Sequence, residues 1–137
     1  MKVTFDKSSK YFFWAAGILT TIGALPTMLC PVSGFRLSFG LTYFDQSPQV
    51  LPVIGHWGIM VVGIGVLLFL SANNKKIRKT TVIFSTLEKV YLVSFAAYGF
   101  IAGVPYAANY ISALIGDSLM VIGGIWYLLR SWKLKQE

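Results

Sequence analysis

Residues 58 to 80 read GIMVVGIGVLLFLSANNKKIRKT, and this stretch decides the fold. Its first part, up to Ala72, is apolar and carries no charge. Asn73 and Asn74 then interrupt the apolar run, and basic residues follow directly in KKIRK. An apolar run of about 20 residues that stops at a basic turn is typical of a helix that crosses a bilayer and ends at its cytoplasmic face.

The composition of the whole chain agrees with a membrane protein. The 137 residues are 55% hydrophobic and only 12% charged, whereas soluble domains average about 25% charged residues. The net charge of +7 does not indicate nucleic-acid binding, because ten of the twelve basic residues lie in three segments. These residues are Lys2, Lys7 and Lys10, then Lys75, Lys76, Arg78 and Lys79, and finally Arg130, Lys133 and Lys135. Basic residues in alternate connections follow the positive-inside rule, so we expect the lipid bilayer, and not nucleic acid, as partner.

Four apolar runs lie between and beside these segments, at about 11–30, 51–72, 81–104 and 110–130. Each is close to the length that a helix needs to cross the hydrocarbon layer, and helices satisfy their backbone hydrogen bonds internally. The sequence therefore predicts an all-α protein: one integral-membrane antiparallel four-helix bundle over residues 1–137. We expect a multi-pass protein of the bacterial inner (plasma) membrane with both termini in the cytoplasm.

The outer connection between the first two runs, residues 31–50, has a different pattern. FRLSFGLTY alternates apolar and polar residues from Phe35 to Tyr43, which is not a helical period. We expect an extended loop that lies on the bundle or in the headgroup layer, and the alternative is a docking surface for another protein. Cys30 precedes this loop and is the single cysteine, so an internal disulfide is excluded.

Small residues recur on one side of several predicted helices. Lipid tails are as apolar as leucine, so helices in membranes associate through small residues that let their backbones approach. The glycines that we expect to pack helices together are Gly55, Gly58, Gly65, Gly99, Gly103 and Gly124.

Two acidic residues lie within the predicted third and fourth helices. Stepping back from Gly103 and Gly99 by helical spacing places Glu88 on the same face, and Asp117 shares a face with Gly124. Lys89, one position further, would then point about 100° away from Glu88, and we expect it to reach the cytoplasmic headgroups. The single histidine, His56, lies some 100–140° away from the glycine face of the second helix.

A charge near the bilayer centre costs about 2.5–3.5 kcal/mol, so such a residue pairs, is protonated or lines a cavity. Glu88, Asp117 and His56 are therefore candidates for binding a ligand or a proton. The alternative is that each one only hydrogen-bonds a neighbouring helix and fixes the packing.

Catalytic and metal motifs are absent from the sequence. One histidine and one cysteine are too few ligands for a zinc site, and a haem on His56 would need methionine or a second copy as axial ligand. We expect no cofactor, no metal site and no catalytic residue.

The run GIMVVGIGVLLFLSA before a short basic turn, and the charged pair in LEKVYL at the start of the third helix, resemble the broad DoxX-like group of small four-helix bacterial membrane proteins. The resemblance implies an accessory or structural subunit, packed with other membrane-protein subunits or with itself, in a redox or quinone-linked complex. The residues themselves suggest a second function. In that function the protein is a proton-linked transporter or binder of a small hydrophobic ligand, such as a lipid or quinone, that uses Glu88.

Overall fold

The computed structural model describes residues 2–41 and 44–136, and these residues are helical apart from the connecting turns. The long helices are α1 (Lys2–Leu29), α3 (Val50–Ser71), α4 (Lys75–Ile101) and α5 (Ile111–Gln136). The short ones are α2 (Pro31–Phe39) and the 3-10 helix η1 (Pro105–Tyr110). No strand occurs in the described ranges, so the all-α class is confirmed.

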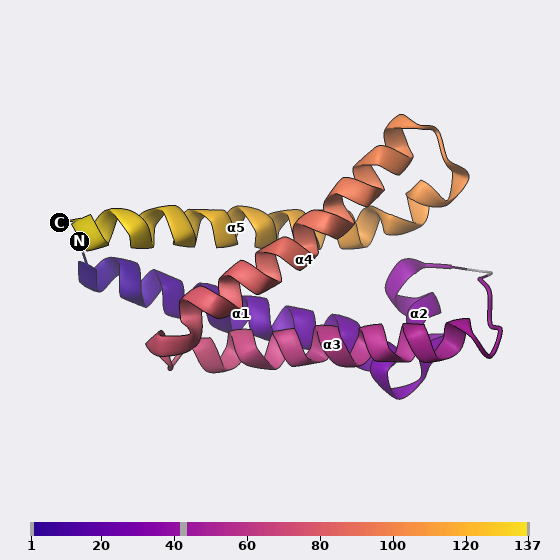
Figure 1. Cartoon of the computed structure of the whole chain (residues 1–137), viewed down its shortest axis with the longest axis horizontal. Coiled ribbons are helices and arrows are strands. Elements are labelled where there is room, and N and C mark those ends of the chain that lie inside the picture. Colours follow the sequence, from indigo (N-terminus) through magenta and orange to yellow (C-terminus); the bar gives the residue numbers. More distant parts are fainter. Residues whose placement is uncertain (1, 42–43, 137) are drawn as a thin grey trace.

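The long helices form two pairs, with α1 packed mainly on α3 and α4 mainly on α5 (Figure 1). Both ends of the chain lie at the same end of the molecule, together with the turn at Asn73 and Asn74. The segments 30–41, 44–49 and 102–110 lie at the opposite end. The three basic segments therefore share one end of the structure.

Three of the helices are long and apolar enough to cross a membrane, over Thr4–Leu29, Val50–Ser71 and Ala113–Lys133. They correspond to the first, second and fourth predicted runs. α4 does not reach the same hydropathy, because charged residues begin the helix and Glu88 and Lys89 interrupt its middle. A membrane crossing at 81–104 stays a prediction.

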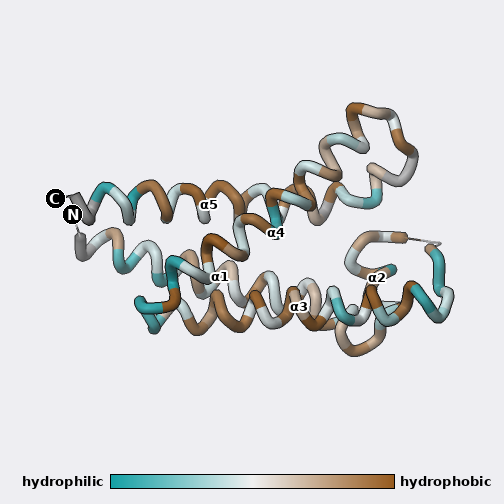
Figure 2. The backbone as a smooth tube through the Cα atoms, in the orientation of Figure 1, coloured by the Kyte–Doolittle hydropathy of each residue, from teal (hydrophilic) through white to brown (hydrophobic). Residues whose placement is uncertain are grey.

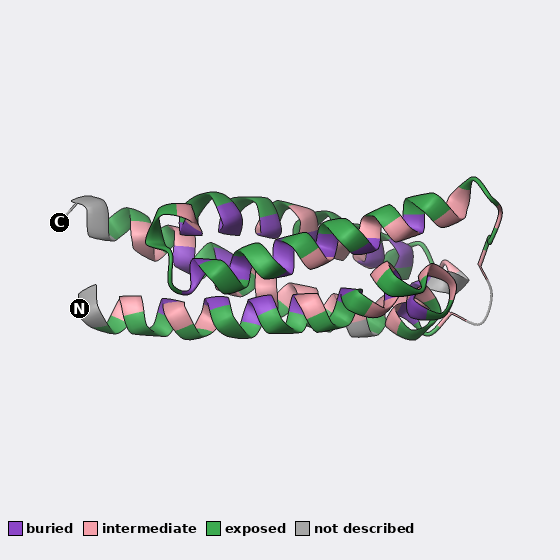
Figure 3. Cartoon of the chain, turned by 90° about the horizontal axis from the view of Figure 1, so that it is seen from below, coloured by how far each residue is buried: buried purple, intermediate pink, exposed green. Residues whose placement is uncertain are grey.

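Apolar side chains cover much of the outside of these helices. Figure 2 shows hydrophobic residues along the lengths of α3 and α5, with hydrophilic ones gathered at the turn between α3 and α4. Figure 3 shows that the outward surfaces of the helices are exposed. Leu19, Ile22 and Leu119, for example, are each about two-thirds exposed. Such surfaces suit contact with lipid.

The pair α1 and α3 packs backbone against backbone through glycines. A methyl group on Gly58 would lie 2.7 Å from the backbone nitrogen of Met28, and one on Gly65 would lie 2.7 Å from that of Thr21. On the α1 side, a methyl group on Gly17 would lie 2.8 Å from the Gly65 carbonyl oxygen. Any side chain at these positions would push the two helices apart. Gly17 was not among the packing glycines predicted from the sequence.

The other expected packing glycines differ in their surroundings. Gly124 of α5 faces Thr86 of α4 so closely that a methyl group there would collide with the threonine hydroxyl, and Gly99 is buried on α4. Gly55 is looser, since its nearest neighbour would be the Pro31 ring at 3.3 Å. The expectation for Gly103 is wrong. With φ +67°, it forms the left-handed turn that ends α4, and nothing lies within 4 Å of its missing side chain.

The expected extended loop at 31–50 is also wrong in its first half, because Pro31–Phe39 form α2. Pro31 suits the first turn of a helix, and Gly40 ends it in the left-handed conformation at φ 61°. Phe35 and Phe39 fit a helical spacing as well as an alternating one, and their rings meet at 4.7 Å. Leu37, between them, is 75% exposed. Tyr43, at the end of the alternating pattern, lies outside the described residues.

α2 folds back against the end of α1. Gly34 lies directly on the backbone of Pro26, and the Ser38 hydroxyl donates a hydrogen bond to the Gly23 carbonyl at 3.1 Å. Phe39 is buried, with its ring 5.4 Å from Trp57 of α3 and 5.2 Å from Tyr110 of η1. α2 thus packs on α1 and α3 through the face that carries Gly34 and Phe39, while Arg36 and Leu37 are exposed.

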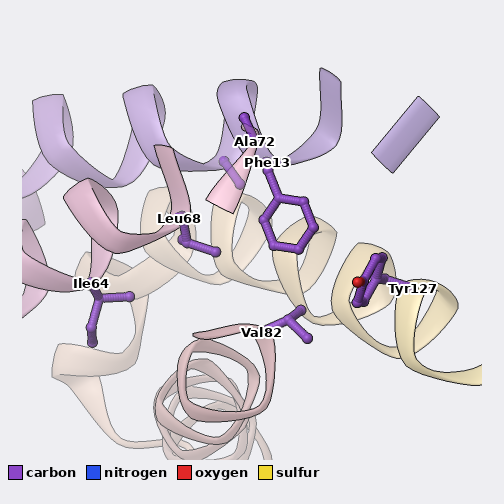
Figure 4. Close-up of a cluster of buried hydrophobic side chains, with 7 residues drawn as sticks. Phe13, Ile64, Leu68, Ala72, Val82 and Tyr127 are labelled. Carbon is purple, nitrogen blue, oxygen red and sulfur yellow. The ribbon is translucent and has the colours of Figure 1, made fainter. Parts of the chain in front are cut away.

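The hydrophobic core lies toward the end that carries the termini. Figure 4 shows its side chains converging from all four long helices. The buried members are Phe13, Ala16, Ile64, Leu68, Ala72, Val82 and Tyr127. The rings of Phe13 and Tyr127 meet edge to face at 5.0 Å and connect α1 to α5.

Arg78 closes the core at this end, although its sequence position suggested only a surface charge. It is 5% exposed, and its guanidinium donates to the carbonyl oxygens of Ser71 (2.7 Å) and Ala72 (2.6 Å) at the end of α3. The same group donates to Asp6 of α1 at 2.6 Å. One side chain therefore caps α3 and holds the beginnings of α1 and α4 against it.

Candidate functional site

A cleft lies where the two helix pairs meet, between α1 and α5. Its volume is about 460 Å³, within the range of about 300–1,000 Å³ that is common for small-molecule sites. α1 and α5 supply most of the wall, α4 supplies Glu88, Lys89 and Leu92, and the end of α2 adds Ser38 and Phe39. The returning α2 therefore closes one end of the cleft.

The walls of the cleft are mostly apolar. Three aromatic side chains take part, Phe12 from α1, Phe39 from α2 and Trp57 from α3. Leu19 and Leu119 also line the cleft, and both are about two-thirds exposed. The mouth therefore lies between α1 and α5, and in a membrane it faces the lipid.

An ionic cluster lies in this apolar wall. The Lys89 ammonium donates to Asp117 Oδ1 of α5 at 2.9 Å and lies 3.4 Å from Glu88 Oε2. The Lys89 side chain is 5% exposed, against 16% for Asp117 and 23% for Glu88. Burial at this level makes the charges dependent on one another, because neither water nor lipid can solvate them adequately.

The expectation that Lys89 points away from Glu88 and reaches the headgroups is wrong. The buried face of α4 runs through Arg78, Ser85, Lys89, Ala96 and Gly99. Helical spacing counted back from Gly99 predicts Glu88 on this face, whereas the buried face includes Lys89, one position later. Both positions fit a helical spacing. Because Asp117 on α5 pairs with Lys89, the lysine is the residue that faces α5.

Glu88 borders the same cleft but lacks a complete set of partners. Its Oε2 is buried and, within the described part of the chain, accepts no hydrogen bond. The 3.4 Å separation from Lys89 is an ion pair without hydrogen-bond geometry, since the ammonium is directed to Asp117. A buried acceptor without a donor is costly, so Glu88 is the least satisfied group of the ionic cluster.

His56 is not part of this site. It is exposed on α3, on the side that also carries Met60, Gly63 and Leu67, which are exposed too. It is not among the residues that line the cleft. The structure brings Glu88 and Asp117 together through Lys89 and leaves His56 on the outer surface.

Ligands for a metal ion do not converge in the described residues, where no three His, Cys, Asp or Glu side chains are grouped. The chemistry that the site offers is therefore ionic and hydrogen-bonding recognition beside an apolar surface. The sequence matches no protein-family model, and neither the curated proteins nor the solved structures provide a match.

Proposed function

We propose that this protein is a membrane-embedded binder of a small amphipathic molecule, held in the cleft between α1 and α5. The observation that carries the proposal is the ionic cluster of Glu88, Lys89 and Asp117 in a mostly apolar cleft of about 460 Å³. The apolar body of a ligand would lie along the aromatic walls, and its polar head would meet the cluster. Such a division of roles is common in ligand sites.

The proposal includes a position in the membrane. All four long helices would cross the bilayer as an antiparallel bundle, with both termini in the bacterial cytoplasm. The gathering of the basic segments at one end of the molecule supports this orientation. The ion pairing of Lys89 with Asp117 lowers the cost of placing α4 in lipid.

The accessory-subunit function, which the DoxX-like resemblance implies, is the competing proposal. It needs a surface that only a protein partner would cover. The exposed apolar side chains are distributed over all the long helices, and lipid covers such surfaces equally well. The cleft is a more specific feature, because lipid tails alone do not satisfy its buried charges.

Blocking the cleft tests the proposal. Gly116 lines the cleft and a Cβ added there meets nothing within 4 Å, so Gly116→Trp introduces a large ring into the cleft from an open position. Gly63→Trp is the matched control, since Gly63 is equally open but lies outside the cleft. The proteins are purified in lipid nanodiscs, and their co-purified small molecules are quantified by mass spectrometry.

We expect a non-bilayer small molecule to accompany the wild type and Gly63→Trp, and to be lost from Gly116→Trp. If the three preparations carry the same molecules, or none, cleft binding is wrong. If a stoichiometric protein co-purifies instead and survives Gly116→Trp, the accessory-subunit function is favoured.

A further inference from the structure

The cleft is lined by more negative than positive side chains, and this excess indicates the charge of the ligand. Two carboxylates, of Glu88 and Asp117, face one ammonium, that of Lys89. These are the only charged residues among those that the structure shows lining the cleft. Lys89 neutralises one carboxylate, so the other is stable in its charged form only with a positive charge from elsewhere, because like charges repel strongly where water is scarce.

We propose that the ligand is a cationic amphiphile, an apolar body whose protonated amine binds Glu88. This inference rests on the proposed function, since it needs the cleft to hold a ligand. The amine binds the carboxylate of Glu88, whose side chain is 23% exposed and whose Oε2 has no hydrogen-bond donor among the described residues. Lys89 keeps its hydrogen bond to Asp117 at 2.9 Å, so the ligand completes the cluster without breaking it.

The aromatic residues of the cleft support a positively charged head with an apolar body. Phe12, Phe39 and Trp57 all line the cleft. The faces of aromatic rings attract ammonium groups, and the attraction grows when the pair is shielded from water. Most of the remaining wall is apolar, with side chains such as Leu19, Leu92 and Met120 that suit a hydrocarbon body, and Thr20 and Ser38 add two hydroxyl groups.

Other head groups fit the cluster less well. A carboxylate or phosphate head would add a third negative group beside Glu88 and Asp117, with a single lysine that is already engaged. A quinone carries only hydrogen-bond acceptors at its head and would leave Glu88 Oε2 without a donor. Among head groups, an ammonium supplies both the missing charge and the missing donor.

Three probes with the same body test this inference: 4-phenylbutylamine, 4-phenylbutanol and 4-phenylbutanoate. Saturable binding to the full chain in nanodiscs is measured by equilibrium dialysis, with empty nanodiscs as the blank for partitioning into lipid. We expect the amine to bind about tenfold more tightly than the alcohol, the gain from one charge-assisted hydrogen bond, and the carboxylate to bind least.

Glu88→Gln keeps the shape of the side chain and removes its charge, so it should reduce the preference for the amine over the alcohol to about twofold or less. Asp45→Asn is the control, because Asp45 is an exposed acid in the loop before α3 and lies outside the cleft. The ranking of the three probes on the wild type decides the inference even if Glu88→Gln folds poorly.

The outcomes separate the two proposals. If the alcohol or the carboxylate binds as tightly as the amine, and Gly116→Trp abolishes that binding, the cleft binds ligands and the cationic inference is wrong. If none of the three probes binds saturably above empty nanodiscs, both the cationic inference and the proposed function are contradicted.

Discussion

Lys89 is buried in the middle of α4 because two acidic side chains lie beside its ammonium group. Asp117 comes from another helix and accepts its hydrogen bond, while Glu88 is its neighbour in the chain. Because the ammonium group of Lys89 is paired with these two carboxylates, its side chain stays between the helices and does not extend toward the headgroups. The residue thus connects α4 to α5 at the same point where the two helices border the cleft.

Removing Lys89 alone should be costly. Lys89→Met leaves two buried carboxylates without their cation, and we expect the free energy of unfolding to fall by about 3–5 kcal/mol. Adding Asp117→Leu should restore most of that loss, because an apolar pair replaces the ion pair. The measurement is denaturation by SDS in mixed micelles, followed by circular dichroism.

The exposed Lys79 serves as the control, since Lys79→Met changes the same charge at the surface of α4. We expect it to leave stability within about 0.5 kcal/mol. Equal stability of Lys89→Met and Lys79→Met would show that the ion pair with Asp117 does not hold the helices together.

At the scale of elements, the pairing of α1 with α3 depends on the absence of side chains. Gly17, Gly58 and Gly65 let the two backbones approach to a distance that no larger residue allows. Close approach increases dispersion contacts, which are the main attraction between helices in lipid. α2 uses the same device, with Gly34 placed on the backbone of Pro26.

Two glycines two positions apart on α3 provide a matched test of this packing. Gly65→Ala would bring a methyl group to 2.7 Å from the Thr21 backbone nitrogen, and we expect a loss of about 1–3 kcal/mol from overpacking. Gly63→Ala meets nothing within 4 Å, so stability should be unchanged or rise by up to about 1 kcal/mol. Thermal unfolding in detergent compares the two, and an equal effect would contradict the close α1–α3 contact.

For the whole molecule, the arrangement of charge agrees with one orientation in a membrane. The termini and the basic turn before α4 gather at one end, and α2 and η1 lie at the other. Arg78 is the exception among the basic residues of this turn, because it faces inward and caps α3. The remaining cations of the turn, such as Lys76 and Lys79, are exposed and free to meet anionic headgroups.

Cysteine labelling on intact cells tests this orientation. In a Cys30→Ser background, Gln46→Cys places a thiol in the exposed loop before α3, and Asn73→Cys places one in the exposed turn before α4. We expect a membrane-impermeant maleimide to label Gln46→Cys at once and Asn73→Cys only after permeabilisation. Labelling of both thiols from the same side would contradict the predicted topology.

The sequence alone determined that the chain is helical, with apolar helices of membrane-spanning length, and it singled out Glu88 and Asp117 as the buried acids. These properties depend on local composition and spacing, which hydropathy and helical period report directly. Only the tertiary structure decided that Lys89 faces inward, that Pro31–Phe39 form a returning helix and that Arg78 caps α3. Each of these depends on a contact with another helix, and a helical period of 3.6 residues leaves neighbouring positions such as 88 and 89 equally able to face that helix until it is placed.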